Sequence, residues 1–266
     1  MPIANLQTYR SIALRVRSTV FGAQGLAAFM ENAVAARLKQ KCGFESIAPA
    51  ANGAADVILD LTITKHARGG DGWIRNSNQV VMDTLLVLSD GQDGDLLGTA
   101  AIHGKSSGTV VNNAPQENEA IDVIARTVAD VLWKSGCGGP RIARAPTPVP
   151  DQGSGAGSGS AVVGTGSGSA GPATPDESRR AEAEGLNNQG KEKLFAADTG
   201  GALALFQQAN GVLPDPKYQF NVCLAFGAME RWDEATSACK QARAMNPSEK
   251  LAAKIDQRLD GLKQRQ

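Results

Sequence analysis

The chain has 266 residues, and its 27 Lys and Arg residues balance its 27 Asp and Glu residues. A formal charge of zero leaves no basic field to hold nucleic acid or an anionic membrane, so we do not expect nucleic-acid binding. The length favours about two folding units. No apolar run approaches the roughly 18 residues that a transmembrane helix requires.

The first residues, MPIANLQTYR, lack the apolar segment that a signal peptide carries. This leaves two interpretations, a cytosolic protein or an exported protein whose leader has been removed. No lipobox cysteine is present, which leaves lipid anchoring open.

The chain begins with a strand pattern that changes to a helix pattern. Apolar residues alternate from Ser11 to Ser18, which predicts a half-buried strand. From about residue 23 to residue 42 the apolar period is helical, and Gly43 is suited to end the helix. The expected buried stripe of this helix consists of Leu26, Phe29, Met30, Val34, Leu38 and Cys42.

Further strand patterns follow, and a second helix closes this part of the chain. Residues 44–48 form a short candidate strand, and alternation predicts three longer strands at residues 57–64, 80–88 and 96–103. An amphipathic helix is expected at residues 117–134. Two amphipathic helices are buried together only if they cover a sheet.

We therefore predict an α+β two-layer sandwich over residues 8–139, with two helices on a mostly antiparallel sheet. The other sheet face would be solvated or would dock another subunit, so self-association through it is possible. This face is expected to carry Arg15, Arg17, Asp60, Thr62 and Thr64. The strand AADVILDLTITK and the hairpin VVMDTLLVLSDGQDGDLLGTAAIHG resemble the small α/β domains of bacterial envelope lipoproteins, such as the TolB N-terminal domain, LpoB and CsgG. This resemblance implies an exported accessory protein, either lipid-anchored as a lipoprotein or without an anchor.

The middle of the chain, residues 140–177, is dominated by Gly, Ser, Ala and Pro and has no apolar periodicity. It is typical of a disordered linker with a root-mean-square span of about 35 Å. Such a linker either lets a tethered module search for a partner or is a passive spacer.

The C-terminal part, residues 178–266, contains a repeat with a spacing of 33 residues. Five positions return in register, which indicates stacked helical units and a binding role more readily than a catalytic one. The repeated pairs are Gly190 with Cys223, Ala202 with Ala235, Phe206 with Cys239, Ala209 with Ala242, and Pro214 with Pro247.

Residues 183–247 resemble two tetratricopeptide (TPR) repeats, each of which is a helix-turn-helix hairpin. The second copy, NVCLAFGAMERWDEATSACKQARAMNP, has Phe226 late in its first helix, Trp232 at the turn and Pro247 at its end. The first copy departs from the family at Lys193, where an aromatic residue is usual. An amphipathic segment at residues 248–263 is typical of a C-terminal cap helix.

The TPR resemblance implies an inner groove that binds a protein or peptide partner, with simple exposure of its residues as the alternative. The implied lining consists of Asn187, Asn188, Lys191, Leu194, Lys217, Phe220, Asn221 and Leu224. The paired Lys and Asn residues of the carboxylate-clamp subgroup are not reproduced. We therefore do not expect recognition of a C-terminal carboxylate.

The four cysteines divide evenly between the two predicted domains, with Cys42 and Cys137 in the first and Cys223 and Cys239 in the second. Each pair follows helix ends or occupies facing helix positions, so two disulfides are expected, with four buried thiols as the alternative. By the TPR resemblance, Cys223 and Cys239 occupy positions whose side chains pack together. Disulfides would indicate an oxidising compartment.

Residues that could perform chemistry are sparse. His66 and His103 end separate strands without further ligands at a recognisable spacing, so we expect no metal and no cofactor. Asp90, Asp93 and Asp95 resemble a calcium cluster, but their spacing and the two Asp-Gly pairs favour a solvated hairpin turn. No nucleophile elbow or phosphate loop is present, and we expect no enzymatic activity.

These observations predict a non-enzymatic adaptor or scaffold of the bacterial envelope, located in the periplasm or at the outer membrane, with the cytoplasm as the alternative. A second hypothesis is an oligomerising accessory component of a secretion or sensory system. A third is a hydrolase, which would require a cleft that holds His66 or His103 with carboxylates.

Overall fold

The computed structural model describes residues 2–50, 55–68, 79–107, 115–139 and 175–264. The N-terminal half contains five strands and two helices: β1 (Ser11–Ser18), α1 (Gln24–Lys41), β2 (Ser46–Pro49), β3 (Val57–Arg68), β4 (Val80–Asp90), β5 (Leu96–Lys105) and α2 (Gln116–Lys134). The C-terminal half is helical: α3 (Pro175–Phe195), α4 (Thr199–Val212), α5 (Pro216–Ala228), α6 (Trp232–Ala244) and α7 (Glu249–Lys263). This confirms the coarse fold class predicted for the two halves, a sheet with helices followed by a helical part.

The sheet is mixed, which corrects the prediction of a mostly antiparallel one. Its strand order is β2-β1-β3-β4-β5. β1 pairs in parallel with both β2 and β3, whereas β4 is antiparallel to β3 and β5. A crossover that contains a helix returns the chain parallel to the strand it left, and α1 forms this crossover between β1 and β2.

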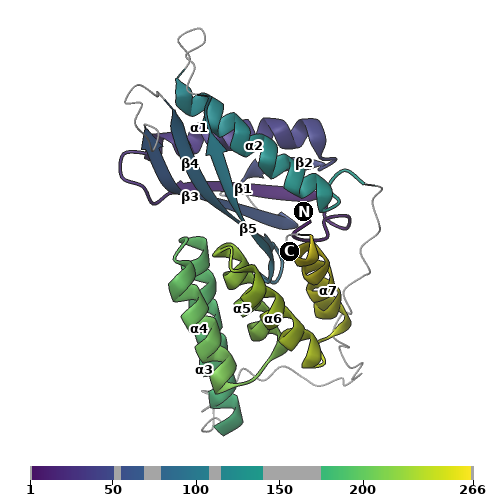
Figure 1. The fold of residues 1–266 in the computed structure, drawn as a ribbon. Helices are drawn as coiled ribbons and strands as arrows, with labels where there is room; N and C mark the ends of the chain where they lie inside the picture. Colours follow the sequence, from purple (N-terminus) through teal and green to yellow (C-terminus); the bar gives the residue numbers. More distant parts are fainter. Residues whose placement is uncertain (1, 51–54, 69–78, 108–114, 140–174, 265–266) are drawn as a thin grey trace, which may run out of the picture.

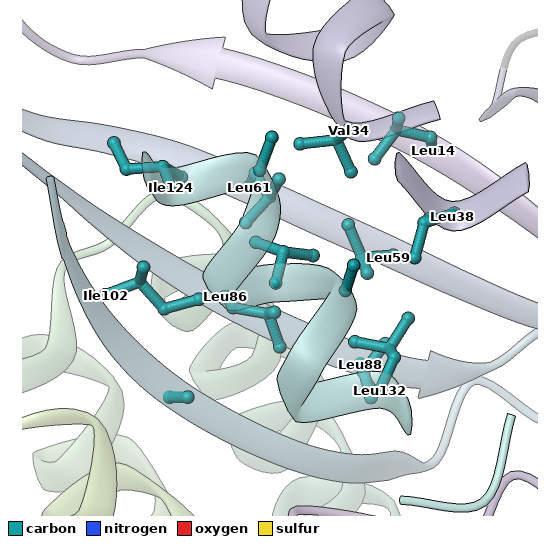
Figure 2. Close-up of a cluster of buried hydrophobic side chains, with 14 of the residues drawn as sticks. Leu14, Val34, Leu38, Leu59, Leu61, Leu86, Leu88, Ile102, Ile124 and Leu132 are labelled. Carbon is teal, nitrogen blue, oxygen red and sulfur yellow. The ribbon is translucent and has the colours of Figure 1, made fainter. Parts of the chain in front are cut away.

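Helices α1 and α2 cover one face of this sheet (Figure 1). The close-up in Figure 2 shows their leucines, valine and isoleucine packed against strand residues such as Leu59, Leu61 and Leu86. Strand residues that alternate toward this face are almost completely buried, because period-2 side chains point to one side of a strand. Alternation in the sequence therefore identified the strand residues of this core.

One predicted core residue of α1 lies outside the core. Phe29 is 64% exposed, whereas Met30, Val34 and Leu38 are fully buried. These three residues repeat every fourth position, which places them above one another on one helix face. Phe29 is rotated about 100° from Met30 and faces away from the sheet.

The C-terminal helices pack in chain order, α3 on α4, α4 on α5, α5 on α6 and α6 on α7. Side-chain caps mark where three of them begin: Asp198 accepts a hydrogen bond from the Gly201 amide, Asp215 from the Lys217 amide and Ser248 from the Leu251 amide. Helix α3 begins at Pro175, so residues 175–177 of the predicted linker are helical. Residues 140–174 lie outside the described part of the chain.

The C-terminal helices lie against the second face of the sheet, opposite α1 and α2 (Figure 1). Leu85, Val87 and Leu96 of this face share one apolar cluster with residues of the helices, among them Phe220 and Leu224. The described chain thus has three layers, two helices, the sheet and five helices. The face that was expected to be solvated or to dock another subunit is covered in part: Asp60 and Thr62 are buried, whereas Arg15, Arg17 and Thr64 are exposed.

Candidate functional site

The candidate site is the interface between the sheet and the helices α3–α7, where residues distant in sequence meet. At the end of α3, the Phe195 carbonyl accepts hydrogen bonds from Arg17 at 3.3 Å and from the Thr62 hydroxyl at 3.0 Å. The last carbonyls of a helix have no partner within the helix, so donors from outside satisfy them. Arg17 also pairs with the buried carboxylate of Asp60 at 2.9 Å. Burial raises the pKa of Asp60, although two arginines act against this.

At the centre of the interface, strand β5 forms hydrogen bonds to two helices. The hydroxyl of Thr99, which is 1% exposed, donates to the Leu224 carbonyl of α5 at 2.8 Å. The Thr99 carbonyl accepts from Arg258 of α7 at 3.3 Å. Arg258 is 2% exposed and is the largest fully buried side chain of the described residues. Buried cations of this kind require polar partners, so this contact fixes how the helices sit on the sheet.

The variant Thr99→Val keeps the side-chain shape but removes the hydroxyl that reaches Leu224. We expect it to lower the free energy of unfolding by about 1 kcal/mol, because a buried hydrogen bond is lost. Urea unfolding of the full chain measures this change. Thr127→Val is the matched control, since the Thr127 hydroxyl only bonds the Val123 carbonyl within α2. Equal stability of the two variants would contradict a role for Thr99 in docking.

An acidic turn between β4 and β5 reaches lysines on the helices. Asp93 pairs with Lys250 of α7 at 2.9 Å, and Asp95 pairs with Lys217 of α5 at 3.1 Å and with Lys254 of α7 at 3.7 Å. The turn was expected to be a solvated hairpin turn. The structure instead makes it an ionic contact between the sheet and the helices.

The pKa shifts in this contact follow from burial and charge. Burial lowers the pKa of Lys254 and, together with the nearby Lys217 cation, the pKa of Lys191. Burial alone would lower the pKa of Lys217 too, but the Asp95 carboxylate raises it. Burial alone would raise the pKa of Asp93, but the hydrogen bonds from Lys250 and the Asp95 amide, together with the charges of Lys250 and Lys254, lower it. The turn therefore carries negative charge that the lysines balance.

Six of the eight predicted groove residues are buried, so they do not line an open groove. These are Asn187, Lys191, Leu194, Phe220, Asn221 and Leu224, whereas Asn188 is exposed and Lys217 is partly buried in its ion pair. The helical face that the TPR resemblance assigned to a partner packs on the chain's own sheet. Within it, the Asn221 amide donates to the Asn187 side-chain oxygen at 2.7 Å, so these amides bond each other.

The two histidines are not brought together. His66 lies 3.7 Å from Glu117, whereas His103 of β5 contacts Asp83 of β4 at 2.8 Å and Glu230, after α5, at 3.4 Å. No group of three or more metal-ligating His, Cys, Asp and Glu side chains occurs within the described ranges. His103 thus belongs to the interface between sheet and helices.

The contacts of His103 predict a pH dependence. The hydrogen bond to Asp83, together with Glu230, raises the pKa of His103 above its usual value of 6.5. A raised pKa in the folded state stabilises the fold below about pH 6.5, and this contribution is lost as the pH rises through the folded-state pKa. We expect His103→Gln to cost less than about 1 kcal/mol at pH 5.5, because the side chain is 57% exposed, and nothing at pH 8.5. Urea unfolding at both pH values tests this; a pH-independent cost would contradict it.

Both cysteine pairs are disulfide-bonded in the structure. Cys42 at the end of α1 joins Cys137, which follows α2, over a sequence separation of 95 residues. Cys223 of α5 joins Cys239 of α6 over 16 residues. One disulfide therefore ties together the two helices that cover the sheet, and the other ties together a helical hairpin.

A separate pocket opens between α4, α5 and α6. Its volume is about 310 Å³, and its lining residues are Gln207, Asn210, Gln219, Val222, Phe226, Glu234, Ser237, Ala238 and Gln241. Asn210 donates to Gln219 at 2.9 Å, and Gln219 donates to Gln241 at 2.8 Å, so a chain of amides fixes one wall. None of these residues was among the predicted groove residues, because they lie on the second helices of the hairpins as well as on α5.

Sequence reasoning missed Thr99, Arg258 and the two lysines of α7. Lys250 and Lys254 are four residues apart on a predicted cap helix, which placed them on one face. The cluster of Asp90, Asp93 and Asp95 in the turn was also apparent from the sequence. Nothing in the sequence indicated that these two features meet.

Across the described segments, no helix combines the length and the apolar character that a membrane span needs.

Comparison with known proteins identifies similarity only in structure. No family model and no curated protein matches the sequence. A PelC dodecamer from Paraburkholderia phytofirmans is 13% identical and covers 48% of this chain and 92% of its own, with a TM-score of 0.38. Protein XCC0632 from Xanthomonas campestris is 10% identical and covers 51% of this chain and 90% of its own, with a TM-score of 0.40.

Lipoprotein GNA1162 from Neisseria meningitidis is 13% identical and covers 47% of this chain and 98% of its own, with a TM-score of 0.30. The similarity lies in the N-terminal half, where the sequence resembled envelope lipoproteins. At these TM-scores the similarity carries no functional argument. The TPR resemblance of the helical half receives no support from these proteins and stays a prediction.

Proposed function

We propose that the chain is a non-enzymatic adaptor of the bacterial cell envelope, whose helices α3–α7 are a TPR-like pair of hairpins with α7 as the cap. The observation that carries this proposal is that the helices already recognise a folded surface, the sheet of the same chain. They do so with an apolar centre, a buried arginine and peripheral ion pairs, which is the composition of a protein–protein interface.

The disulfides support a periplasmic location. Disulfides persist in oxidising environments and are rare in the cytosol, and in bacteria the periplasm is the oxidising compartment. Two disulfides in one chain favour the periplasm over the cytoplasmic alternative.

The pocket between α4, α5 and α6 is the surface we assign to the partner, because the opposite face of the helices is covered by the sheet. Its polar lining consists of amides, the Ser237 hydroxyl and the Glu234 carboxylate, and its apolar lining includes Val222, Phe226 and Ala238. Amides can bond a peptide backbone, while the apolar residues can receive one side chain. The hydrolase hypothesis gains no support here, since neither histidine lines this pocket.

Site-specific photo-crosslinking in cells tests this function. We expect a photoreactive residue at Gln241 to give a discrete cross-linked protein, and one at the exposed Lys39 of α1 to give none. The product should disappear when Ser237→Arg fills the pocket. Equal labelling from Gln241 and Lys39, or a product that is insensitive to Ser237→Arg, would overturn the assignment.

Self-association stays a prediction of the alternative hypothesis. Asp60 and Thr62 of the sheet face on which it was based are buried, whereas Arg15, Arg17 and Thr64 of this face are exposed. Light scattering of the full chain measures its mass directly.

A further inference from the structure

One face of the helices carries lysines that pair with an acidic turn of the sheet. Lys217, Lys250 and Lys254 come from two helices, and Asp93 and Asp95 of the turn between β4 and β5 pair with them. Lys217 also lies 3.8 Å from Glu184 of α3, and Lys250 lies 3.9 Å from Asp90 at the end of β4. Lys254 is only 14% exposed, and Lys191 of α3 is 9% exposed. Four lysines on one face repel one another, so the acidic turn supplies the charge that this face requires.

The turn has a defined shape as well as charge. The side chain of Asp93 accepts a hydrogen bond from the Asp95 amide at 2.9 Å, and Gly94 between them has a φ of 66°. Asp95 is followed by Leu96, which enters the apolar cluster of the helices. The helices therefore hold a compact motif, two carboxylates two residues apart followed by a buried leucine.

We propose that this turn is an internal occupant of a surface that binds acidic protein segments, and that the closed form of the chain is autoinhibited. The inference rests on the proposed function only in taking α3–α7 as a protein-binding unit. A competing partner presents an acidic turn followed by an apolar residue. It binds when the chain's own turn has left the lysines.

The energetics favour a switch of this kind. Surface ion pairs contribute little, but a half-buried lysine that loses its carboxylate leaves an uncompensated charge. Loss of the turn therefore destabilises the closed form until another carboxylate replaces it. We call the state in which the turn has left the lysines the open form. The apparent affinity of the chain for an external acidic segment rises with the fraction of molecules in this form.

The test uses the full chain and a fluorescent peptide with the sequence of residues 86–97, LVLSDGQDGDLL. Peptide binding is measured by fluorescence anisotropy for wild type and for Asp93→Asn/Asp95→Asn. We expect the variant to bind at least about 10-fold more tightly, because its own turn no longer competes for the lysines. The matched control is Asp122→Asn/Asp130→Asn, which removes two carboxylates of α2 that pair with Arg37 and Lys41. It should bind as wild type does.

A second variant separates release of the turn from binding of the peptide to the lysines. Lys250→Glu/Lys254→Glu also breaks the ionic contact but reverses the charge of the surface, so it should not bind the peptide. The proposal is overturned if Asp93→Asn/Asp95→Asn binds no more tightly than wild type while both disulfides and the helical circular dichroism are intact. It is also overturned if adding Lys250→Glu/Lys254→Glu to Asp93→Asn/Asp95→Asn leaves the peptide affinity of that variant unchanged. The photo-crosslinking at Gln241 reads a different face, so either idea can fail alone.

Discussion

Replacement of Cys42 and Cys137 by alanine together should lower the free energy of unfolding by about 4.5 kcal/mol. The disulfide closes a loop with a sequence separation of 95 residues, and a loop of this length restricts the unfolded chain by about that amount in the chain-entropy model. It joins the ends of the two helices that cover the sheet, so its loss also frees the segment after α2. Urea unfolding followed by circular dichroism measures the change.

The matched comparison is Cys223→Ala/Cys239→Ala, whose disulfide spans 16 residues. The same model gives about 3 kcal/mol for this loop. The order of the two effects is thus part of the prediction. Equal or reversed losses would show that loop length does not determine the contribution of these disulfides.

Gly227→Ala should leave the protein about 2 kcal/mol less stable than Gly211→Ala, a glycine-to-alanine change at an open position of the same helical part. A Cβ atom at Gly227 would collide with the guanidinium of Arg258, whose other nitrogen donates to the Thr99 carbonyl. Because Arg258 is 2% exposed, it has little room to move away. The collision therefore disturbs the contact that fixes α7 and α5 on β5.

Gly211→Ala is the control, since a Cβ at Gly211 of α4 meets nothing within 4 Å. Alanine favours helix over glycine by about 1 kcal/mol, so this variant should be stabilised. Urea unfolding of both variants gives the difference. If Gly227→Ala is as stable as Gly211→Ala, the close approach of Arg258 does not hold the helices in place.

The elements of this protein were largely readable because their signals are local. Alternation in β1, β3, β4 and β5 and the helical stripes of α1 and α2 predicted their type and approximate bounds. The prediction that Phe29 is buried was wrong. Neighbouring positions on a helix differ by about 100°, so the sequence does not reveal whether an apolar residue beside the stripe faces the core or the solvent. The parallel pairing of β1 was not predicted, because alternation of apolar residues reports burial but not strand direction.

The candidate site was less predictable than the elements. The repeat register identified the helical face that carries Asn187, Asn221 and Leu224. In the structure Asn221 donates to Asn187, and the Leu224 carbonyl accepts a hydrogen bond from the sheet. The sheet of the same chain contacts this side of the helices through Thr99 and the acidic turn. Contacts across more than a hundred residues leave no trace in local periodicity, because each side is compatible with water when it is read alone.

The sequence by itself determined the strands, the helices, the repeat spacing and the division of the cysteines, since each depends on side-chain period or on position along the chain. The tertiary structure decided strand direction, the docking of α3–α7 on the sheet and the burial of the predicted groove. Those depend on which surfaces meet. Half-polar faces such as that of Thr62 and Thr99 become interior only when a complementary face supplies their hydrogen bonds and counter-charges.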